Sequence, residues 1–363
     1  RSKEDRSMFA DNQRISHRQL FRQLVLGQLG IYLVTIPVTS YLEGRQGVLS
    51  LLLMGVLFFA ASIFFIRMKL CYLCPERYMG KYAGKIFCLL HLSYLFITGV
   101  FLLLVTSRIT GRFFIESSKP FVIITVTAVV CYLGSHQGLE RRARMAEICF
   151  PIILFVLAAM FLLSVTRVEG IYLEKTGSLS LQGLIQGCYR VFCTFLPVFF
   201  LPFTLGNVDR AGNAGKALNG SVFLLLGILS AALILLQGAF GAGGYVQKSY
   251  PLFDMMAGVD LPGDFLERVD IFFIAAVMFC IFFAVGSIFF YNHELLKRGH
   301  MEKGAPYLAA GILVCALGCE KAGISLEWYR EVLQNIYAPL FLLLALWAGI
   351  AYGRGKHHDK EEK

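Results

Sequence analysis

The sequence has few charged residues for its length. Only 16% of its 363 residues are Asp, Glu, Lys or Arg, whereas 57% are hydrophobic, and the mean hydropathy is +0.65. A soluble domain of this size needs more polar side chains to cover its surface. The composition therefore excludes an ordinary soluble protein and favours a chain whose surface faces lipid.

The sequence also lacks the short motifs of common enzyme classes. It contains no His-Glu-x-x-His, no glycine-rich phosphate-binding loop and no nucleophile elbow. Its ten cysteines are scattered, and the pair Cys71 and Cys74 has no second pair that would complete a metal site. No basic run is interleaved with aromatic residues as in nucleic-acid-binding domains. We therefore expect no enzymatic activity, cofactor, metal, disulfide or nucleic-acid partner.

Long apolar stretches, in contrast, are abundant. A helix of about 20 apolar residues crosses the hydrocarbon core of a bilayer. Ten stretches approach or reach this length, and they predict an all-α polytopic membrane protein with about ten transmembrane helices. The predicted spans cover residues 17–37, 48–66, 86–106, 120–134, 145–165, 183–203, 219–240, 269–290, 305–319 and 336–352.

Lysine and arginine are divided unevenly between the two sides of these spans. With the N-terminus placed inside, 23 of the 34 lie in inside segments and ten in outside loops, while Arg190 lies within a span. Because these residues accumulate on the cytoplasmic side, both termini are predicted to be cytoplasmic. The formal charge of +10 is then a topology signal that also suits contact with anionic lipid headgroups. The polar, basic N-terminus has no apolar core of a cleavable signal.

Ten spans divide into two sets of five, and the first span of each set contains helix breakers. Span 1 includes Gly27, Gly30 and Pro37, and span 6 includes Pro197 and Pro202. Interrupted helices at matching positions are typical of inverted-repeat transporters, because free backbone groups are tolerated in a membrane only where they line a cavity. We therefore predict that helices 1 and 6 are broken. The alternative is ordinary kinked helices that bind nothing.

The sequence shows no linker rich in Pro, Gly or Ser and no separate soluble domain. We expect a polar cytoplasmic tail at 1–13, a first five-helix repeat at 14–166, a second at 167–353, and a charged cytoplasmic tail at 354–363.

Three segments resemble one known family. They are "QRISHRQLFRQLVLGQLGIYLVTIP" at 13–37, "GLERRARMAEICFPIILF" at 138–155, and "YPL" at 250–252 followed by "GDFLER" at 263–268. In this order they resemble the spore-germination permease family, the B subunits of Ger-type nutrient receptors. The resemblance implies the amino acid–polyamine–organocation superfamily, with a LeuT-like five-plus-five inverted repeat.

Two positions depart from the family pattern. Members often carry a glutamate within span 6, where this chain reads "RVFCTFLP" and has Cys193, and the loop before span 4 has "ESSKPF" instead of a Thr-Pro. The first departure puts a conventional proton-coupling role of span 6 in doubt.

Polar groups within the predicted spans are functional candidates, because they are costly in hydrocarbon. Arg190 could hold a ligand carboxylate, or it could reach the outer surface by snorkelling. His91 and Tyr94 share a helix face and could line a cavity, although a buried core histidine is more common. Thr35 and Thr194 could bind a ligand, although backbone carbonyls are their usual partners.

The resemblance adds Ser287, because this superfamily can place hydroxyl ligands for sodium at that position of span 8. The predicted ligand-binding residues are Gly27, Gly30, Ile31, Thr35, His91, Tyr94, Arg190, Cys193, Thr194, Pro197 and Ser287.

The loop before span 8 gathers five acids between 254 and 270. Asp264 and Glu267 have the spacing of a capping box that would open span 8 at the positive end of its dipole. Arg268 could pair with Asp264 or with a loop carbonyl, so these three residues are predicted to anchor the span at the outer face. Asp254 and Asp270 could form a docking surface or simply keep the loop solvated.

These observations predict the membrane-embedded subunit of a spore germinant receptor, which binds a small nutrient such as an amino acid between spans 1, 3, 6 and 8. The resemblance implies an A-type membrane subunit and a C-type lipoprotein as partners, in the spore inner membrane. One alternative is an ion- or proton-coupled amino acid transporter. Another is a structural subunit without a ligand.

Overall fold

A computed structural model describes residues 15–39, 41–114, 119–136, 138–174, 179–204, 208, 214–241, 244, 245, 247–259 and 268–361 of the chain. Within these residues the regular structure is helical, and one isolated β-bridge joins Ile15 to Val208.

The ten predicted spans correspond in order to ten helices or groups of helices. The first five are α1 (His17–Thr35), α2 (Gly44–Arg67), α5 (Lys81–Phe113), α6 (Pro120–Ser135) and α7 (Gly138–Ser164). The sixth span is α9 (Leu181–Thr194) with η2 (Leu196–Phe200) and α10 (Leu201–Thr204). The others are α11 (Ala214–Phe240), α13 (Asp270–Arg298), α14 (Ala305–Lys321), and α15 (Glu327–Val332), which continues through the π-helical turn η6 (Leu333–Tyr337) into α16 (Ala338–Glu361).

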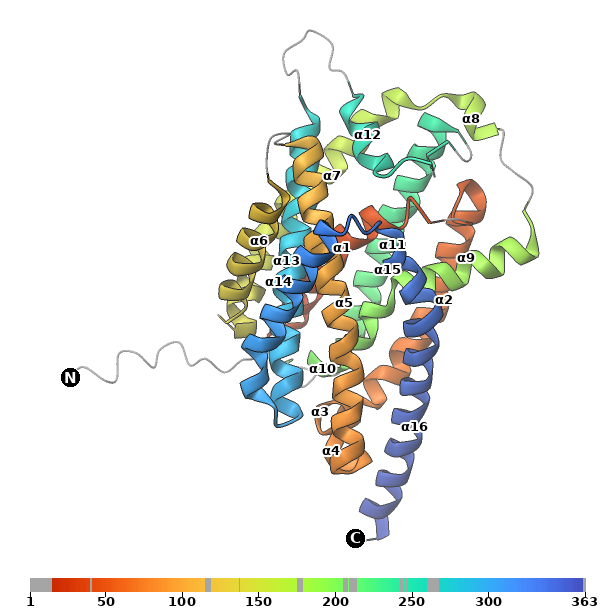
Figure 1. Cartoon of the computed structure of the whole chain (residues 1–363). Helices are drawn as coiled ribbons and strands as arrows, with labels where there is room; N and C mark the ends of the chain where they lie inside the picture. The colour runs from red at the N-terminus through yellow and green to blue at the C-terminus, as the bar shows by residue number, and fades with distance from the viewer. Residues whose placement is uncertain are drawn as a thin grey trace, which may run out of the picture.

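Short helices connect these spans at both ends of the bundle. They are α3 (Lys69–Leu73) and α4 (Pro75–Met79) at one end, and α8 (Gly170–Glu174) and α12 (Pro251–Ala257) at the other (Figure 1). The predicted boundary between the two repeats falls in the 3-10 helix η1 (Val165–Arg167).

The described helices have the length and surface of an integral membrane protein. Six are long and apolar enough to cross a membrane, and α6 is a shorter apolar helix. Large apolar side chains lie exposed on the bundle, among them Phe155 at 74% and Phe223 at 81% of their surface. Contact of such a surface with hydrocarbon costs no free energy, whereas its contact with water is unfavourable.

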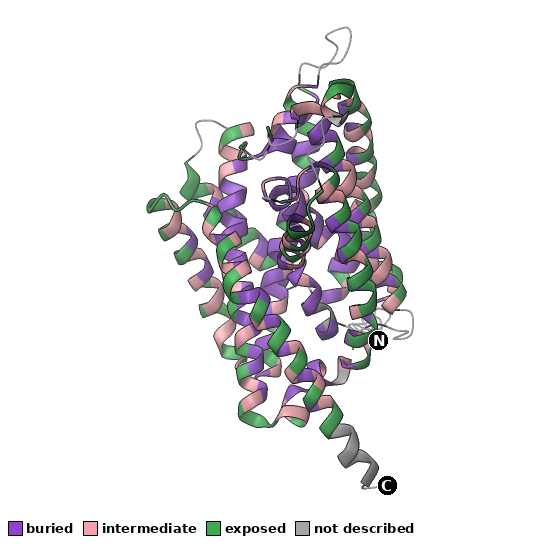
Figure 2. Ribbon diagram, turned by 90° about the vertical axis from the view of Figure 1, so that its right-hand side faces the viewer, coloured by how far each residue is buried: buried purple, intermediate pink, exposed green. Residues whose placement is uncertain are grey.

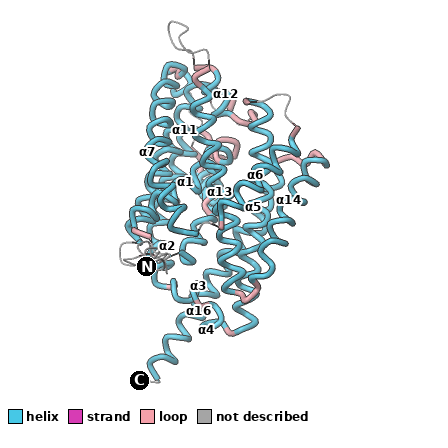
Figure 3. The backbone as a smooth tube through the Cα atoms, turned by 90° about the vertical axis from the view of Figure 1, so that its left-hand side faces the viewer, coloured by secondary structure: helices cyan, strands magenta, loops and turns pink. Residues whose placement is uncertain are grey.

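The helices form two packed groups with α1 between them. α2 packs on α9 and α11, while α5, α6, α13 and α14 pack on one another. α1 contacts α11 of the first group and α13 of the second (Figure 3). Buried residues gather along the middle of the bundle (Figure 2). The central helix therefore brings both groups to one interior surface.

The structure differs from the sequence prediction in span 1, where α1 is not broken. It runs as one helix through Gly27 and Gly30, ends at Thr35, and is followed by Pro37 in a turn. A Cβ at Gly30 would lie 2.8 Å from the backbone nitrogen of Ile281 on α13. Small residues let membrane helices approach closely, so Gly30 serves packing here rather than unwinding.

The predicted break in span 6 is confirmed. α9 ends at Thr194, the next turn is a 3-10 helix that contains Pro197, and α10 follows it. A proline removes one backbone donor and clashes with the preceding turn, which favours a break in the α-helical bonding at this point.

Candidate ligand-binding site

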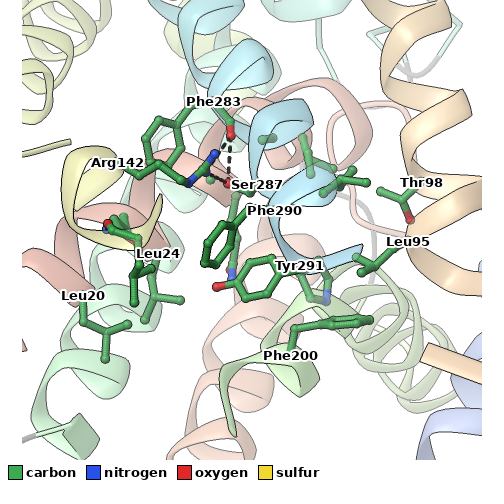
Figure 4. Close-up of a pocket in the computed structure, with 18 of the residues that line it drawn as sticks. Leu20, Leu24, Leu95, Thr98, Arg142, Phe200, Phe283, Ser287, Phe290 and Tyr291 are labelled. Atoms are coloured by element: carbon green, nitrogen blue, oxygen red, sulfur yellow. Dashed lines mark hydrogen bonds between the residues drawn. The ribbon is translucent and has the colours of Figure 1, made fainter. Parts of the chain in front are cut away.

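A buried cavity lies where α1, α5, α7, η2 and α13 meet (Figure 4). Its volume is about 70 Å³. It is lined by Leu20, Gln23, Leu24, Gly27, Gln28, Ile31, Tyr94, Leu95, Thr98, Leu139, Arg142, Pro197, Phe200, Phe283, Ala284, Ser287, Ile288, Phe290 and Tyr291. The lining is mostly apolar with a few polar groups, as in most small-molecule sites.

Arg142 brings a positive charge to this cavity. The residue is only 8% exposed, and its Nη2 donates to the carbonyl oxygen of Phe283 at 3.3 Å and to the Oγ of Ser287. Its guanidinium carbon lies 4.9 Å from the ring centre of Phe283 and 5.6 Å from that of Phe290. In the part of the chain that the structure describes, no Asp or Glu forms an ion pair with Arg142.

The helical register of α7 explains why Arg142 points inward. It shares the buried face of the helix with Leu139 and Ala143, whereas its neighbours Arg141 and Arg144 are exposed. The sequence prediction treats all three arginines as inside loop charges, because it begins span 5 at residue 145. The buried 3.6-residue pattern around Arg142 is the signal that identifies it.

Other polar side chains border the cavity from α1 and α5. The hydroxyl of Tyr32 donates to Oε1 of Gln28 at 2.7 Å, and Gln28 is buried. The hydroxyl of Tyr329 donates to Oγ1 of Thr98 at 3.2 Å. These bonds fix the orientation of the Gln28 amide and the Thr98 hydroxyl, so the cavity offers hydrogen-bonding groups opposite its apolar walls.

Comparison with known proteins identifies the family. The spore permease family model, described as spore germination protein, matches residues 14–313. The chain belongs to this spore germination permease family. It is 24% identical over 296 residues to spore germination protein YndE of Bacillus subtilis (strain 168), covering 79% of this chain and 81% of the relative. It is 22% identical over 368 residues to spore germination protein KB of the same organism, covering 92% and 95%.

Solved structures show the fold of this spore germination permease family member. A Na⁺-coupled sialic acid symporter matches with a TM-score of 0.63 at 14% identity, covering 97% of this chain and 80% of the symporter. A manganese transporter from Eremococcus coleocola matches with a TM-score of 0.60 at 14% identity, covering 93% and 77%. The all-α, LeuT-like fold predicted from the sequence is therefore confirmed.

Five of the predicted ligand-binding residues line the cavity of this permease. They come from spans 1, 3, 6 and 8 as expected, and they are Gly27, Ile31, Tyr94, Pro197 and Ser287. The sequence analysis missed the contribution of span 5, namely Arg142.

The other predicted residues of spans 1 and 3 lie elsewhere. Gly30 packs on α13, and Thr35 donates to the carbonyl of Ile31 at 2.8 Å. His91 is fully buried among aromatic rings, and its Nδ1 lies 2.8 Å from the carbonyl oxygen of Phe87. The histidine therefore belongs to the core rather than to the cavity lining.

The predicted residues of α9 also lie outside the cavity lining. Arg190 donates to Oε1 of Gln334 at 2.6 Å, and Thr194 donates to the carbonyl oxygen of Arg190 at 3.1 Å. Cys193 is buried and is not among the residues that line the cavity. Arg190 thus links α9 to the π-helical turn η6. The break in span 6 directs α9 away from the cavity, whereas Pro197, which follows the break, lines it.

Ser287 has a different neighbour from the one the resemblance implies. Its Oγ donates to the carbonyl oxygen of Phe283 at 2.8 Å and accepts a hydrogen bond from Arg142. A sodium ion at this hydroxyl would meet the guanidinium as a like charge. The geometry therefore favours an anion beside Ser287 over a cation.

The predicted outer anchor is described in part. Asp264 and Glu267 lie outside the described residues, and α13 begins at Asp270 with Val269 as its N-cap, so the expected capping box does not open this helix. Arg268 donates to the carbonyl oxygen of Phe113 and to Oδ2 of Asp270, both at 3.0 Å. The anchor therefore joins the beginning of α13 to the end of α5.

Proposed function

We propose that this chain is the nutrient-binding membrane subunit of a spore germinant receptor, and that it binds a small amino acid in the cavity beside Arg142. Family membership supports the role in germination. The observation that carries the ligand assignment is the buried guanidinium of Arg142, which has no ion-pair partner among the described residues.

A buried cation without a counter-charge is costly. Neutral partners, the carbonyl of Phe283 and the hydroxyl of Ser287, satisfy only part of the guanidinium's five N–H donors. A carboxylate can accept two parallel hydrogen bonds from arginine and supply the missing charge. An amino acid ligand would therefore gain its strongest contact at Arg142.

The volume of the cavity limits the ligand to a small one. A water molecule needs roughly 10–15 Å³ of such volume, so about 70 Å³ holds on the order of five water-sized groups. Glycine or alanine suits this space, and a larger nutrient would require the helices to separate. The hydroxyl of Thr98 and the amide of Gln28 also line the cavity, and their oxygens would accept hydrogen bonds from the ammonium end.

Signalling would follow from a shift between two arrangements of the broken sixth span. A ligand changes such an equilibrium only through its different affinities for the two states. Pro197 and Phe200 of η2 line the cavity, so a ligand contacts the break directly. The proposal includes an A-type membrane subunit and a C-type lipoprotein as partners, the spore inner membrane as location, and cytoplasmic termini.

The germination response tests the site with two neighbouring arginines. Arg142→Gln removes the buried charge, whereas Arg141→Gln removes the exposed one next to it. We expect Arg142→Gln to raise the nutrient concentration for half-maximal germination by about tenfold or more, equivalent to about 1.4 kcal/mol, and Arg141→Gln to leave it unchanged. Immunoblots of spore membranes control for protein level. Equal dose responses of the two variants would refute the assignment.

A second experiment tests the carboxylate itself. Purified protein is heated with a panel of amino acids and with the corresponding carboxamides, because a ligand that binds the folded state raises the unfolding temperature. We expect stabilisation by at least one small amino acid, none by its carboxamide, and none in Arg142→Gln. Equal stabilisation by acid and amide would mean that the carboxylate does not bind a cation.

Coupled amino acid transport is a second candidate, favoured by the likeness of the fold to two solute transporters. Uptake of the stabilising amino acid into proteoliposomes, driven by a proton or sodium gradient, distinguishes it from a receptor that binds without transport.

A further inference from the structure

A second and larger cleft lies between the ends of α1 and α5, the segment before α12 and the beginning of α15. Its volume is about 420 Å³. It is lined by Val34, Thr35, Val38, Phe101, Arg108, Arg112, Gln247, Lys248, Ser249, Tyr250, Ser325, Leu326, Glu327 and Arg330. We propose that this cleft, called the vestibule below, is an anion-capturing site that first binds the carboxylate of small ligands. The biological role of the vestibule rests on the proposed function. Its test does not, because the test uses no nutrient.

Four basic side chains line the vestibule, and Glu327 is the one acid among its described lining residues. The basic residues come from three separate segments: Arg108 and Arg112 from α5, Lys248 from the segment before α12, and Arg330 from α15. Such convergence of like charge on one cleft is unfavourable unless acidic side chains, a ligand or a counter-ion offset it.

Arg108 and Arg112 are held in place by groups that are not part of the lining. Arg108 donates to the carbonyl oxygen of Ile324 and lies 3.5 Å from the carboxylate of Glu320. Arg112 pairs with Asp254 at 2.9 Å. Neither acid is among the residues that line the vestibule. The cations therefore border the open space while their partners lie outside it, so the vestibule presents the positive side of each pair.

Arg330 is also fixed, by the carbonyl oxygen of Val38 and by Glu327 at 3.6 Å, and both of these partners line the vestibule themselves. Guanidinium groups that are already oriented lose little freedom when they bind an anion. Their placement is what a preorganised anion site requires.

Lys248 adds a charge that no described acid offsets. Its ammonium lies 4.6 Å from the ring centre of Phe240, and it forms no ion pair with any residue that the structure describes. Nearby, burial raises the pKa of the Tyr250 hydroxyl to about 12. Tyr250 therefore stays protonated at physiological pH and adds a donor rather than a negative charge to the vestibule.

The vestibule and the cavity beside Arg142 have neighbouring lining residues on α1 and α5. Thr98 of α5 lines the cavity, and Phe101, one turn further, lines the vestibule. On α1, Ile31 and Thr35 are related in the same way. The linings of the two cavities are therefore about one helical turn apart where they come nearest, roughly 5–6 Å along the helix axis. Arg108 lies further along α5, about 15 Å beyond Thr98 along the same axis.

A charged cleft with apolar walls focuses the electric field and raises the local concentration of a small ion of opposite sign by roughly 10- to 1,000-fold. The effect is measurable with a cysteine and two thiol reagents of opposite charge. Ser325→Cys places the reporter in the vestibule, and Gly170→Cys places a control on α8, where a Cβ meets nothing within 4 Å.

Full-length protein in sealed phosphatidylcholine vesicles is treated from outside with sulfonatoethyl or trimethylammonioethyl methanethiosulfonate, and modification of each site is quantified by peptide mass spectrometry. We expect the ratio of anionic to cationic reagent rates to be about tenfold higher or more at Ser325→Cys than at Gly170→Cys. High salt should reduce this excess, because it screens exposed charges. Equal ratios at the two sites would overturn the proposal.

Charge variants assign the effect to the vestibule. Lys248→Gln should lower the excess, Lys248→Arg should retain it, and Lys321→Gln, which removes an exposed lysine outside the lining, should not change it. Retention of the excess in Lys248→Arg also shows that the protein still folds when residue 248 is substituted. An excess that does not respond to Lys248→Gln would contradict the assignment.

Two further arms define the chemistry of the anion. Acetate should slow the anionic reagent at Ser325→Cys more than acetamide does, and equal effects would refute carboxylate recognition. The excess should persist when the vesicles contain phosphatidylglycerol. Loss of the excess in these vesicles would mean that lipid headgroups fill the vestibule. Because no nutrient is used, these results stand or fall separately from the Arg142 experiments.

Discussion

The ring of Tyr329 lies flat on the ring of Phe101, with centroids 3.8 Å apart and planes inclined by 8°. Tyr329 also donates its hydroxyl to Thr98, which lines the inner cavity, whereas Phe101 lines the vestibule. Both rings are buried. The stacked pair therefore lies between the inner cavity and the vestibule, and we predict that it closes a route between them.

Removing the ring of Tyr329 should open this route. A cysteine at Thr98 reports on it, because Thr98 borders the inner cavity. We expect Tyr329→Ala to accelerate modification of Thr98→Cys by a reagent added at the vestibule side by about tenfold or more, which corresponds to about 1.4 kcal/mol in the free energy of opening. Tyr329→Phe keeps the stack and should stay slow. Equal rates in all backgrounds would show that the stack is no barrier.

Gly30 should be intolerant of any side chain. A Cβ there would lie 2.8 Å from the backbone nitrogen of Ile281 and 3.0 Å from the Cβ of Cys280, so α1 and α13 would have to separate. We expect Gly30→Ala to destabilise the protein by about 1–3 kcal/mol, measured as a lower unfolding temperature in detergent. Gly227→Ala is the matched control on α11, because a Cβ there meets nothing within 4 Å. A loss of stability in both variants would point to glycine flexibility instead of packing.

The same glycine shows what can and cannot be inferred from sequence here. Span positions and the break at Pro197 follow from local properties, namely apolar length and a missing backbone donor. The role of Gly30 depends on whether another helix lies within contact distance, and no local pattern around the residue states this. The prediction of unwinding at Gly30 and the observation of close packing start from the same glycine.

The candidate site was harder to predict than the fold. Arg142 looks like a cytoplasmic loop charge until the beginning of α7 is known to lie at Gly138, because only the register of that helix separates it from Arg141. Arg190 shows the reverse case. It lies within an apolar stretch, but the geometry of the break in span 6 directs it to Gln334 instead of the cavity. Both outcomes depend on where the side chain points in the tertiary structure rather than on residue type.

Gly27 should separate ligand binding from stability. A Cβ there would lie 3.7 Å from Oγ of Ser287, an ordinary contact, so the helices need not move. The added methyl group would occupy part of a cavity of about 70 Å³. We expect Gly27→Ala to change the unfolding temperature little, but to weaken binding of the stabilising amino acid by about 1 kcal/mol, roughly fivefold. Unchanged affinity, measured by titration of the purified protein, would place the ligand elsewhere.

Arg268 should stabilise the protein through the carboxylate of Asp270. That side chain is 7% exposed at the beginning of α13, and Arg268 links it to the carbonyl oxygen of Phe113 at the end of α5. Arg268→Gln leaves a buried carboxylate without its cation, so we expect a loss of about 1–3 kcal/mol. Asp270→Asn removes the charge that needs a partner, so the double variant should be less destabilised than the sum of the single variants, by about 0.5–3 kcal/mol. The unfolding free energies of the four proteins in detergent give this coupling directly. If the two losses simply add, Arg268 stabilises the protein through contacts other than Asp270, the carbonyl oxygen of Phe113 among them, and the acid at the beginning of α13 contributes through its interaction with the helix dipole.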